Sequence, residues 1–530
     1  MNRPADATTL VEGSAEHHLP GEYDSTKGKA IVIGSGFGGL AVAIRLLAEG
    51  WAVELLERHK DLGGRARVFH LDGVAFDAGP TVITAPFLFE DLFRLLGERF
   101  DEHVTLLPVE PFYRMEYADG SHFNYSASIE ETVAEIDRLS PGEGDEYHRF
   151  LAATEAMYQR GFVDLADQPF TRVMDMLRVL PDLVRLRADI SLHGFVSRFF
   201  KDERLQRAFS VPSLLVGGHP FKTSSLYGLI HALERRGGVW YPKGGTGALV
   251  TSLAELFQRH GGVIRTQQHV SALTVEGKQV TGVETADGTH RSADIVVSNA
   301  DPLHVYEHWL PMGPWGRSLN AWRRRMKQSM GLMVVYFTTR RTYSELEHHT
   351  IVFGDTFREI LDAIFDKHEL VNDLSLYLHR PGATDPDMAP EQGDAFYVLA
   401  PVPNLKGGHN WDTLEPQLTQ QILKMLAERV MPDLFEQLGE THAVSPRYFH
   451  QELSSPFGSG FSIAPTLTQS AGLRFHNQSP HFSNLYFVGA GTHPGAGVPG
   501  VVSSAAVVDR LVKQNPIARP QQTADKSLAS

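Results

Sequence analysis

Apolar residues near the N-terminus follow two patterns in turn, a continuous run and a helical repeat. Residues 29–33 and 51–56 are short and almost entirely apolar, which is typical of strands buried in a parallel sheet. Between them, apolar residues recur at the i, i+3, i+4 and i+7 spacing of a helix with one buried face: Leu40, Ala43, Ile44 and Leu47. The pattern predicts a strand–helix–strand unit over residues 29–57, close to the roughly 30 residues that a βαβ unit needs.

A glycine-rich turn joins the first strand to the helix. Gly34 permits the tight turn, Gly36 lets the backbone approach a pyrophosphate, and Gly39 lets the helix pack close to the strand. The N-terminus of the helix carries a partial positive charge that favours phosphate. Glu57 closes the second strand and can accept hydrogen bonds from both ribose hydroxyls, which favours NAD or FAD over NADP. The unit therefore predicts a bound dinucleotide.

A second glycine-rich segment, residues 61–67, directly follows the second strand. It brings two more glycines and two arginines near the same site: Gly63, Gly64, Arg65 and Arg67. Taken alone, the segment is equally an ordinary surface loop with solvated arginines. Because it follows the dinucleotide motif, and because FAD is long enough to contact both glycine segments, we expect FAD rather than NAD.

Elements of the same kind return after long insertions. Further strands are predicted at residues 262–266, 270–284, 293–301 and 485–492, and helices at 248–260 and 499–512. We therefore expect an α/β protein with a discontinuous FAD-binding domain, residues 28–100, 246–302 and 481–513. Residues 101–245 and 303–480 are expected to form a domain for substrate and membrane contact, and residues 1–27 and 514–530 to be flexible tails.

Composition excludes several classes of function. The chain has 530 residues, 63 acidic against 49 basic, and a net charge of −14, which disfavours binding to nucleic acid. It has no cysteine, so disulfides, thiolate metal sites and a cysteinyl flavin link are excluded, and we expect no metal. Neither a secretory signal nor a membrane-spanning run is found, so the protein is expected to be soluble or peripheral.

Further motifs lie outside the glycine loop. They include Phe76-Asp-Ala-Gly79-Pro80-Thr81-Val82, Ser213-Leu-Leu-Val-Gly-Gly218, Gly238-Val-Trp-Tyr-Pro-Lys-Gly-Gly-Thr-Gly247 and His493-Pro-Gly-Ala-Gly-Val-Pro-Gly500. In this order, and together with the glycine loop, they resemble the bacterial-type phytoene desaturases, which belong to the amine-oxidase-like flavoproteins. The resemblance runs from about residue 29 to about residue 512.

The resemblance implies a fold and a set of cofactor contacts. The fold would be a Rossmann-like FAD-binding domain of the GR2 flavoprotein type, with an inserted substrate domain and a helical membrane-associated region. Noncovalent FAD would contact the glycine loop, the ribose and pyrophosphate sites, an adenine site and the flavin end: Gly34, Ser35, Gly36, Phe37, Gly38, Gly39; Glu57, Arg58, Gly64, Arg65; Val270; Gly79, Pro80, Thr81, Gly491, Thr492, Val498 and Pro499.

The chemistry that the resemblance implies is repeated dehydrogenation of phytoene, a C40 hydrocarbon, through carotene intermediates toward neurosporene or lycopene. Flavin would take the hydride, and oxygen or a quinone would reoxidise it. Hydride loss beside a double bond leaves an allylic cation, whose next proton is acidic, so a weak base suffices. Asp77, His231 and Glu234 are the candidates. Each is more readily explained as a structural residue, so the sequence assigns no catalytic residue.

A hydrocarbon substrate predicts an apolar tunnel and a surface that touches lipid. Residues 173–200 interleave arginines with apolar residues, and Arg323, Arg324, Arg325 and Lys327 form a second basic cluster. A solvated helix face is the alternative, because Asp175, Asp182 and Asp189 dilute the charge of the first segment. We expect a cytoplasmic protein held peripherally at the inner face of the cell membrane.

Three functions remain open at this point. The first is phytoene desaturation. The second is the same chemistry on another carotenoid, by a ketolase, a hydroxyneurosporene desaturase or a C30 desaturase. The third is a noncatalytic carrier of prenyl groups similar to the GDP-dissociation inhibitors, which the intact glycine loop, Glu57 and the C-terminal loop disfavour.

Overall fold

A sheet of five parallel strands forms the centre of the computed structural model, which describes residues 27–71, 73–170, 173–310 and 324–515. In spatial order its strands are β19 (Leu485–Phe487), β13 (Ile295–Ser298), β1 (Lys29–Ile33), β2 (Ala52–Leu56) and β9 (Val263–Arg265). They come from segments more than 400 residues apart in the chain, so the sheet unites its two ends. The helices and strands predicted around residues 29–57, 248–301 and 485–512 are confirmed.

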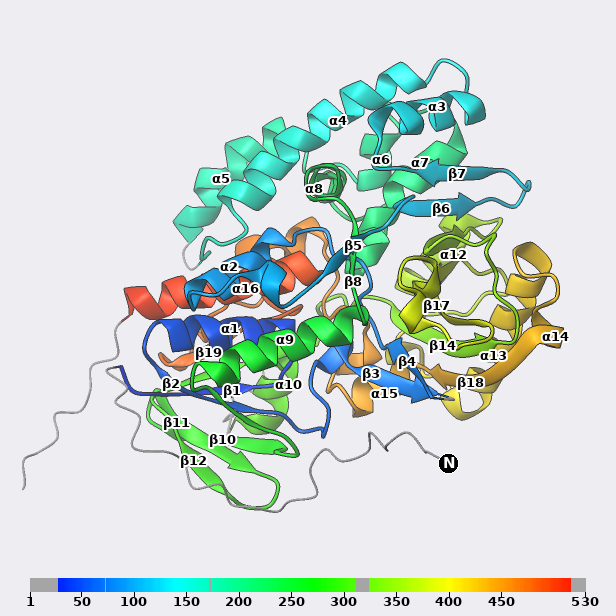
Figure 1. Cartoon of the computed structure of the whole chain (residues 1–530). Helices are drawn as coiled ribbons and strands as arrows, with labels where there is room; N and C mark the ends of the chain where they lie inside the picture. The colour runs from blue at the N-terminus through cyan, green and yellow to red at the C-terminus, as the bar shows by residue number, and fades with distance from the viewer. Residues whose placement is uncertain (1–26, 72, 171–172, 311–323, 516–530) are drawn as a thin grey trace, which may run out of the picture.

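Both faces of this sheet are buried, which explains its continuous apolar strands. Ala30 and Val32 of β1 share one core with the four helices on that face: α1 (Phe37–Ala48), α2 (Phe87–Leu95), α9 (Gly245–Arg259) and α16 (Val498–Gln514). Ile31 and Ile33 point the other way and share a core with the antiparallel strands β10 (Val270–Glu276) and β11 (Gln279–Thr285), which β12 (His290–Ser292) extends (Figure 1).

A second, mixed sheet lies beside the first and forms the right-hand half of Figure 1. Its seven strands are, in order, β18 (Leu438–Val444), β14 (Gly331–Thr339), β17 (Asp394–Val402), β16 (Leu376–His379), β15 (His349–Val352), β6 (Tyr113–Glu116) and β7 (His122–Tyr125). Only β15 and β6 run parallel within it. Helix α13 (Trp411–Arg429) packs on one face, and Tyr336 and Tyr397 point from the other.

A layer of helices closes the molecule above both sheets (Figure 1). Its members are α3 (Ile129–Leu139), α4 (Gly144–Tyr158), α5 (Val173–Arg185), α6 (Leu192–Val196), α7 (Glu203–Ser210) and α8 (Leu229–Gly237). An aromatic core centred on Phe150 and Phe209 holds most of this layer together. Among the described residues, no helix is both long and apolar enough to cross a bilayer.

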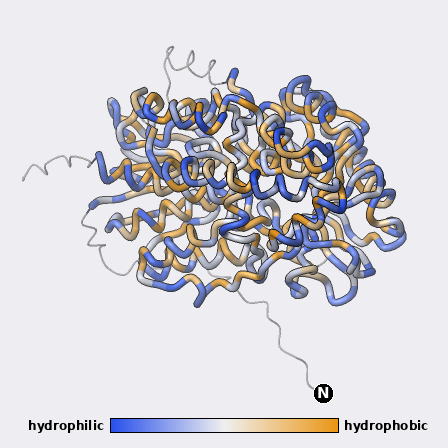
Figure 2. Tube along the Cα trace, turned by 90° about the horizontal axis from the view of Figure 1, so that it is seen from above, coloured by the Kyte–Doolittle hydropathy of each residue, from blue (hydrophilic) through white to orange (hydrophobic). Residues whose placement is uncertain are grey.

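Shorter elements connect the three layers. They are α10 (Pro302–His304), α12 (Phe357–Asp362), α14 (Leu434–Gln437), α15 (Pro446–Gln451), and the strand pairs β3 (Val68–Leu71) with β4 (Val74–Asp77) and β5 (Leu106–Pro108) with β8 (Trp240–Pro242). Figure 2 shows hydrophobic segments inside the molecule and hydrophilic ones along its outline. Residues 1–26 and 516–530 of the expected tails, and Arg323 of the basic cluster, lie outside the described residues.

A buried ion pair joins the ends of β16 and β17, two neighbouring inner strands of the second sheet. The Arg380 guanidinium lies 2.6 Å from an Asp394 carboxylate oxygen that also accepts the Tyr343 N–H, and both charged side chains are almost fully buried. We expect Asp394→Asn to lower the free energy of unfolding by about 3 kcal/mol, because it leaves the buried arginine without its counter-charge. The shift of the urea midpoint measures this loss.

Glu428→Gln is the control for that variant, because it removes an exposed glutamate paired with Lys424 at 3.7 Å. Exposed pairs contribute little, so its midpoint should equal that of the wild type. Equal midpoints for all three proteins would show that the buried pair contributes no stability.

Candidate active site

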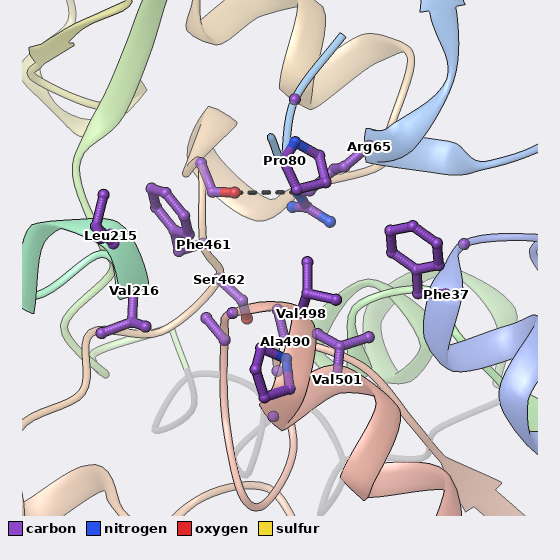
Figure 3. A pocket seen from close by; sticks show the side chains of 18 of the residues that line it. Phe37, Arg65, Pro80, Leu215, Val216, Phe461, Ser462, Ala490, Val498 and Val501 are labelled. Atoms are coloured by element: carbon purple, nitrogen blue, oxygen red, sulfur yellow. Dashed lines mark hydrogen bonds between the residues drawn. The ribbon is translucent and has the colours of Figure 1, made fainter. Parts of the chain in front are cut away.

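One continuous cavity of about 590 Å³ lies where the three layers meet. It begins at the carboxyl ends of β1 and β2, where open α/β sheets bind ligands, and continues between the second sheet and the helical layer. Side chains from distant parts of the chain point into it in Figure 3: Phe37, Arg65, Pro80, Leu215, Val216, Phe461, Val498 and Val501. The cavity thus brings together residues from all three layers.

The glycine loop between β1 and α1 shows why side chains are absent there. Gly34 has a φ of +95°, a conformation that glycine adopts without strain. A Cβ on Gly39 would lie 1.9 Å from the Gly34 carbonyl oxygen, and one on Gly36 would lie 2.9 Å from Asn299 Oδ1. Gly39 therefore serves the helix–strand contact, whereas Gly36 borders the cavity.

Glu57 is held at the cavity wall by three hydrogen bonds. Its Oε2 accepts the Ser35 N–H at 2.9 Å and the Ser35 hydroxyl at 2.6 Å, and its Oε1 accepts the His59 N–H at 2.9 Å. The side chain is buried and borders the cavity. It therefore presents two fixed acceptor oxygens beside the glycine loop. A ribose diol needs such acceptors for its two hydroxyl donors.

The second glycine segment lies directly against the first. A Cβ on Gly64 would meet Gly36 Cα at 3.5 Å, and the Gly63 N–H donates to the Ser35 hydroxyl at 3.1 Å. The Arg65 guanidinium, next in sequence, donates to the Gly460 carbonyl at 3.0 Å and lies near the half-buried Asp301. Burial lowers the pKa of Arg65, and the Asp301 carboxylate offsets part of that shift. Together these groups form a narrow backbone cradle with a cation at its edge.

Arg58 borders the cavity, but its guanidinium is used elsewhere. It donates to the Ser454 hydroxyl at 3.0 Å and to the Gln451 carbonyl at 2.9 Å, at the end of α15. Arg58 therefore ties the end of β2 to the segment after α15, which also borders the cavity through Ser454.

The C-terminal loop and α16 complete the cradle from the far end of the chain. Gly491, Val498 and Pro499 border the cavity, as do Gly79, Pro80, Thr81 and Val270. Among the predicted cofactor residues, Gly38, Gly39 and Thr492 do not border it. The Thr492 hydroxyl donates to the Gly489 carbonyl at 3.0 Å, which stabilises the loop.

Asn299 is a residue at this site that the sequence did not single out. Its Oδ1 accepts the Gly39 N–H at 2.9 Å, and its Nδ2 donates to the Val488 carbonyl at 3.3 Å. It therefore ties the start of α1 to the end of β19. Its position after β13, which parallels β1, is the signal that could have placed it there.

Two of the three candidate catalytic residues are explained by structure. The Asp77 carboxylate accepts hydrogen bonds from Tyr241 at 2.8 Å and Thr246 at 2.9 Å, and it does not border the large cavity. His231 Nε2 donates to the Phe209 carbonyl at 2.8 Å, and burial lowers its pKa to about 4. Glu234, in contrast, borders the cavity, and burial raises its pKa to about 7.

A row of hydrogen-bonded polar side chains lies between the end of the cavity at the glycine loop and the end at the helical layer. The Thr81 hydroxyl lies 2.7 Å from that of Tyr377, which lies 2.6 Å from His349 Nδ1. Tyr397 donates to the Gly79 carbonyl at 2.9 Å. Sequence reasoning missed Tyr377, Tyr397 and His349, because their strands reach the Gly79–Thr81 turn only through tertiary packing.

Comparison with known proteins decides the family. The model described as flavin containing amine oxidoreductase matches residues 37–507. The chain belongs to this family. It is therefore an FAD-dependent oxidoreductase.

Two curated relatives align with nearly the whole chain. A lycopene-forming phytoene desaturase of Pseudescherichia vulneris is 48% identical over 91% of this chain and 99% of its own length. A neurosporene-forming phytoene desaturase of Cereibacter sphaeroides is 41% identical over 95% and 98%.

Solved structures show the same fold at low identity. An oxidoreductase from Methanosarcina mazei is 18% identical with a TM-score of 0.60, covering 91% of this chain and 100% of that one. Cyclohexylamine oxidase from Brevibacterium oxydans is 16% identical with a TM-score of 0.57, covering 92% and 99%.

The glycine loop allows a direct test of where the dinucleotide lies. We expect Gly36→Val to abolish FAD retention, because its side chain would occupy the space between Gly36, Asn299 and the Gly63–Gly64 segment. Flavin absorbance after gel filtration measures the bound fraction, and circular dichroism checks that the variant is folded. A folded variant that retains FAD at the wild-type stoichiometry would contradict this placement.

Proposed function

We propose that this flavoprotein is a phytoene desaturase that removes pairs of hydrogens from phytoene and its carotene intermediates. The observation that supports this function best is the second half of the cavity. Beyond the polar cradle its walls are apolar, with contributions from the helical layer and the second sheet: Leu214, Leu215, Leu226, Leu229, Ile230, Leu233, Ile351, Phe353, Phe357, Leu376. A substrate with polar groups would find few partners there, whereas a hydrocarbon gains about 25 cal/mol per Å² of surface buried.

The proposed division of labour follows the segments of the chain. Residues 28–100, 246–302 and 481–513 hold FAD through the predicted contacts that border the cavity, and residues 101–245 and 303–480 hold the hydrocarbon. Bound FAD supplies the acceptor for hydride from an allylic C–H bond. The apolar wall orients the chain of the substrate and keeps water from the carbocation that hydride loss creates. Oxygen or a quinone reoxidises the cofactor.

We further propose that α5 is the surface that meets the membrane. Its inner side, Met176, Val179 and Leu183, borders the cavity. Its outer side is a stripe of apolar residues that are each more than half exposed: Met174, Leu177, Leu180 and Val184. Arg178 and Arg185 are exposed on the same helix. An amphipathic helix with arginines on its polar side suits an anionic lipid surface.

The position of α5 supports a route from lipid to the cavity. The helix lies at one edge of the helical layer (Figure 1), and its Met176 packs against Gly472, next to the half-exposed Leu473. The second basic cluster is less suited, because Arg324 is paired with Glu307 through two hydrogen bonds. Docking at the inner face of the cell membrane through α5 would let a hydrocarbon enter without crossing water.

The activity can be tested directly with purified protein. Phytoene in liposomes, incubated with FAD-loaded protein and either oxygen or a quinone, should yield coloured neurosporene or lycopene, measured by chromatography and absorbance. Protein stripped of FAD is the control. Phytoene returned unchanged while another carotene, a hydroxylated carotene or a C30 carotene is consumed would replace this function with a related one.

The membrane surface gives a separate test. We expect the double variant Leu177→Glu, Leu180→Glu to reduce co-sedimentation with anionic liposomes several-fold, because it places charge in the stripe that would enter the headgroup region. Phe435→Glu on α14 is the matched control, since Phe435 is also about half exposed but lies in the other half of the molecule. Equal binding by both variants would exclude α5 as the docking surface.

A further inference from the structure

Glu234 is out of place on the face of α8 that borders the hydrocarbon end of the cavity. The same face carries Leu229, Ile230 and Leu233, and the glutamate itself is 0% exposed to solvent. A buried carboxylate costs several kcal/mol unless it is paired, and a hydrocarbon cannot pair with it. Its presence in this wall therefore requires a reason other than substrate binding.

The hydrogen bonds of Glu234 satisfy only one of its two oxygens. Oε1 accepts the Tyr113 hydroxyl at 2.9 Å. Oε2 has no hydrogen-bond partner among the described residues, and the Nδ1 atom of His231 lies 3.9 Å away, beyond bonding distance. Tyr113 thus fixes the carboxyl group and leaves Oε2 without a hydrogen-bond partner. Besides the large cavity, Glu234 also lines a small second pocket together with Tyr113 and His231.

The charged and titratable neighbours leave Glu234 without a counter-ion. Arg235 turns its guanidinium away, to Tyr147 at 2.7 Å, the Ala127 carbonyl at 2.8 Å and Thr132 at 3.0 Å. His231 donates through Nε2 to a backbone carbonyl, so in the neutral ring its Nδ1 carries no proton and offers only a lone pair. Burial raises the pKa of Glu234 to about 7, and the Tyr113 hydrogen bond and Arg235 offset only part of that rise.

Other acidic residues at the cavity are already used. Among the described residues that border it, the remaining carboxylates are Glu57, Asp301 and Glu452. Glu57 accepts hydrogen bonds from Ser35 and from the His59 N–H, Asp301 accepts from Ser462 and the Leu303 N–H beside Arg65, and the Glu452 side chain is 44% exposed near His59. All three belong to the dinucleotide end, so Glu234 is the acid of the hydrocarbon end.

We propose that Glu234 is the catalytic base that takes the proton lost by the substrate in each desaturation. This role rests on the proposed function. One C–H bond gives up a hydride, with both its electrons, to the cofactor. The adjacent C–H bond then breaks, its electron pair forms the new C=C bond, and its proton binds Oε2 of Glu234. The neutral acid that results is the form that the apolar wall favours.

The test compares Glu234→Gln with two further variants. The amide keeps the shape and the Tyr113 hydrogen bond but cannot take a proton, so single-turnover conversion of phytoene should slow by about 100-fold or more. Glu234→Asp should recover part of the rate. Glu143→Gln is the matched control, because Glu143 is a buried glutamate of the helical layer that accepts the Lys201 N–H at 2.8 Å and does not border the cavity. It should react at the wild-type rate.

Two readouts separate a catalytic base from a structural residue. Infrared difference spectra of the FAD-loaded protein, taken without substrate across about one pH unit on each side of 7, should show a buried carboxylic acid that ionises, and Glu234→Gln should lack it. Phytoene deuterated at one carbon of the first reacting bond at a time should show a larger isotope effect in Glu234→Gln only at the carbon that loses the proton.

The outcomes distinguish this role from the proposed function. If the wild type converts phytoene and Glu234→Gln, with FAD bound, converts it at a similar rate, Glu234 is not the base and the desaturase function stands. If slow conversion in Glu234→Gln comes with unchanged isotope effects at both carbons, Glu234 acts only through the structure of the wall. If the FAD-loaded wild type leaves phytoene unchanged, the proposed function and this role both fail.

Discussion

In the function that we propose, two ligands of opposite character share one cavity, and the arrangement of the three layers suits that constraint. A dinucleotide carries charged phosphates and needs backbone donors and fixed acceptors, whereas a hydrocarbon needs a wall with almost no polar atoms. The parallel sheet provides the first environment at the carboxyl ends of its strands, where the glycine loop and Glu57 lie. The second sheet and the helical layer provide the second environment. Reaction requires that the two environments meet without a water-filled gap.

The meeting point is the turn at Gly79, Pro80 and Thr81. It follows β4 and is held from the second sheet by Tyr377 and Tyr397. Polar side chains there bond to one another or to backbone, so they fix the turn without offering a charge to the substrate. The carboxyl group of Glu234 differs, because one of its oxygens is left without a partner in an apolar wall. That contrast is what assigns it to chemistry rather than to stability.

The local features of the fold could be predicted from the sequence, and the long-range ones could not. The unit over residues 29–57 is encoded by periodicity and by glycines whose roles depend only on neighbouring atoms, so strand, helix and loop were all predicted. For Asn299, which joins α1 to β19, the only signal was its place after a strand predicted to be parallel. Tyr113 meets Glu234 across 121 residues, and no local pattern signals that pair. In the sequence, Asp77 was as good a catalytic candidate as Glu234. Only the hydrogen bonds from Tyr241 and Thr246 show that it is structural. The cofactor contacts and domain boundaries remain predictions.

A crystal structure of the FAD-loaded protein with a bound carotene would test the shared cavity most directly. We expect the isoalloxazine ring to lie beside the Gly79–Thr81 turn, and the carotene to run along the face of α8 with a reacting carbon near Glu234. A carotene bound outside this cavity, or separated from the flavin by a layer of protein, would contradict this expectation.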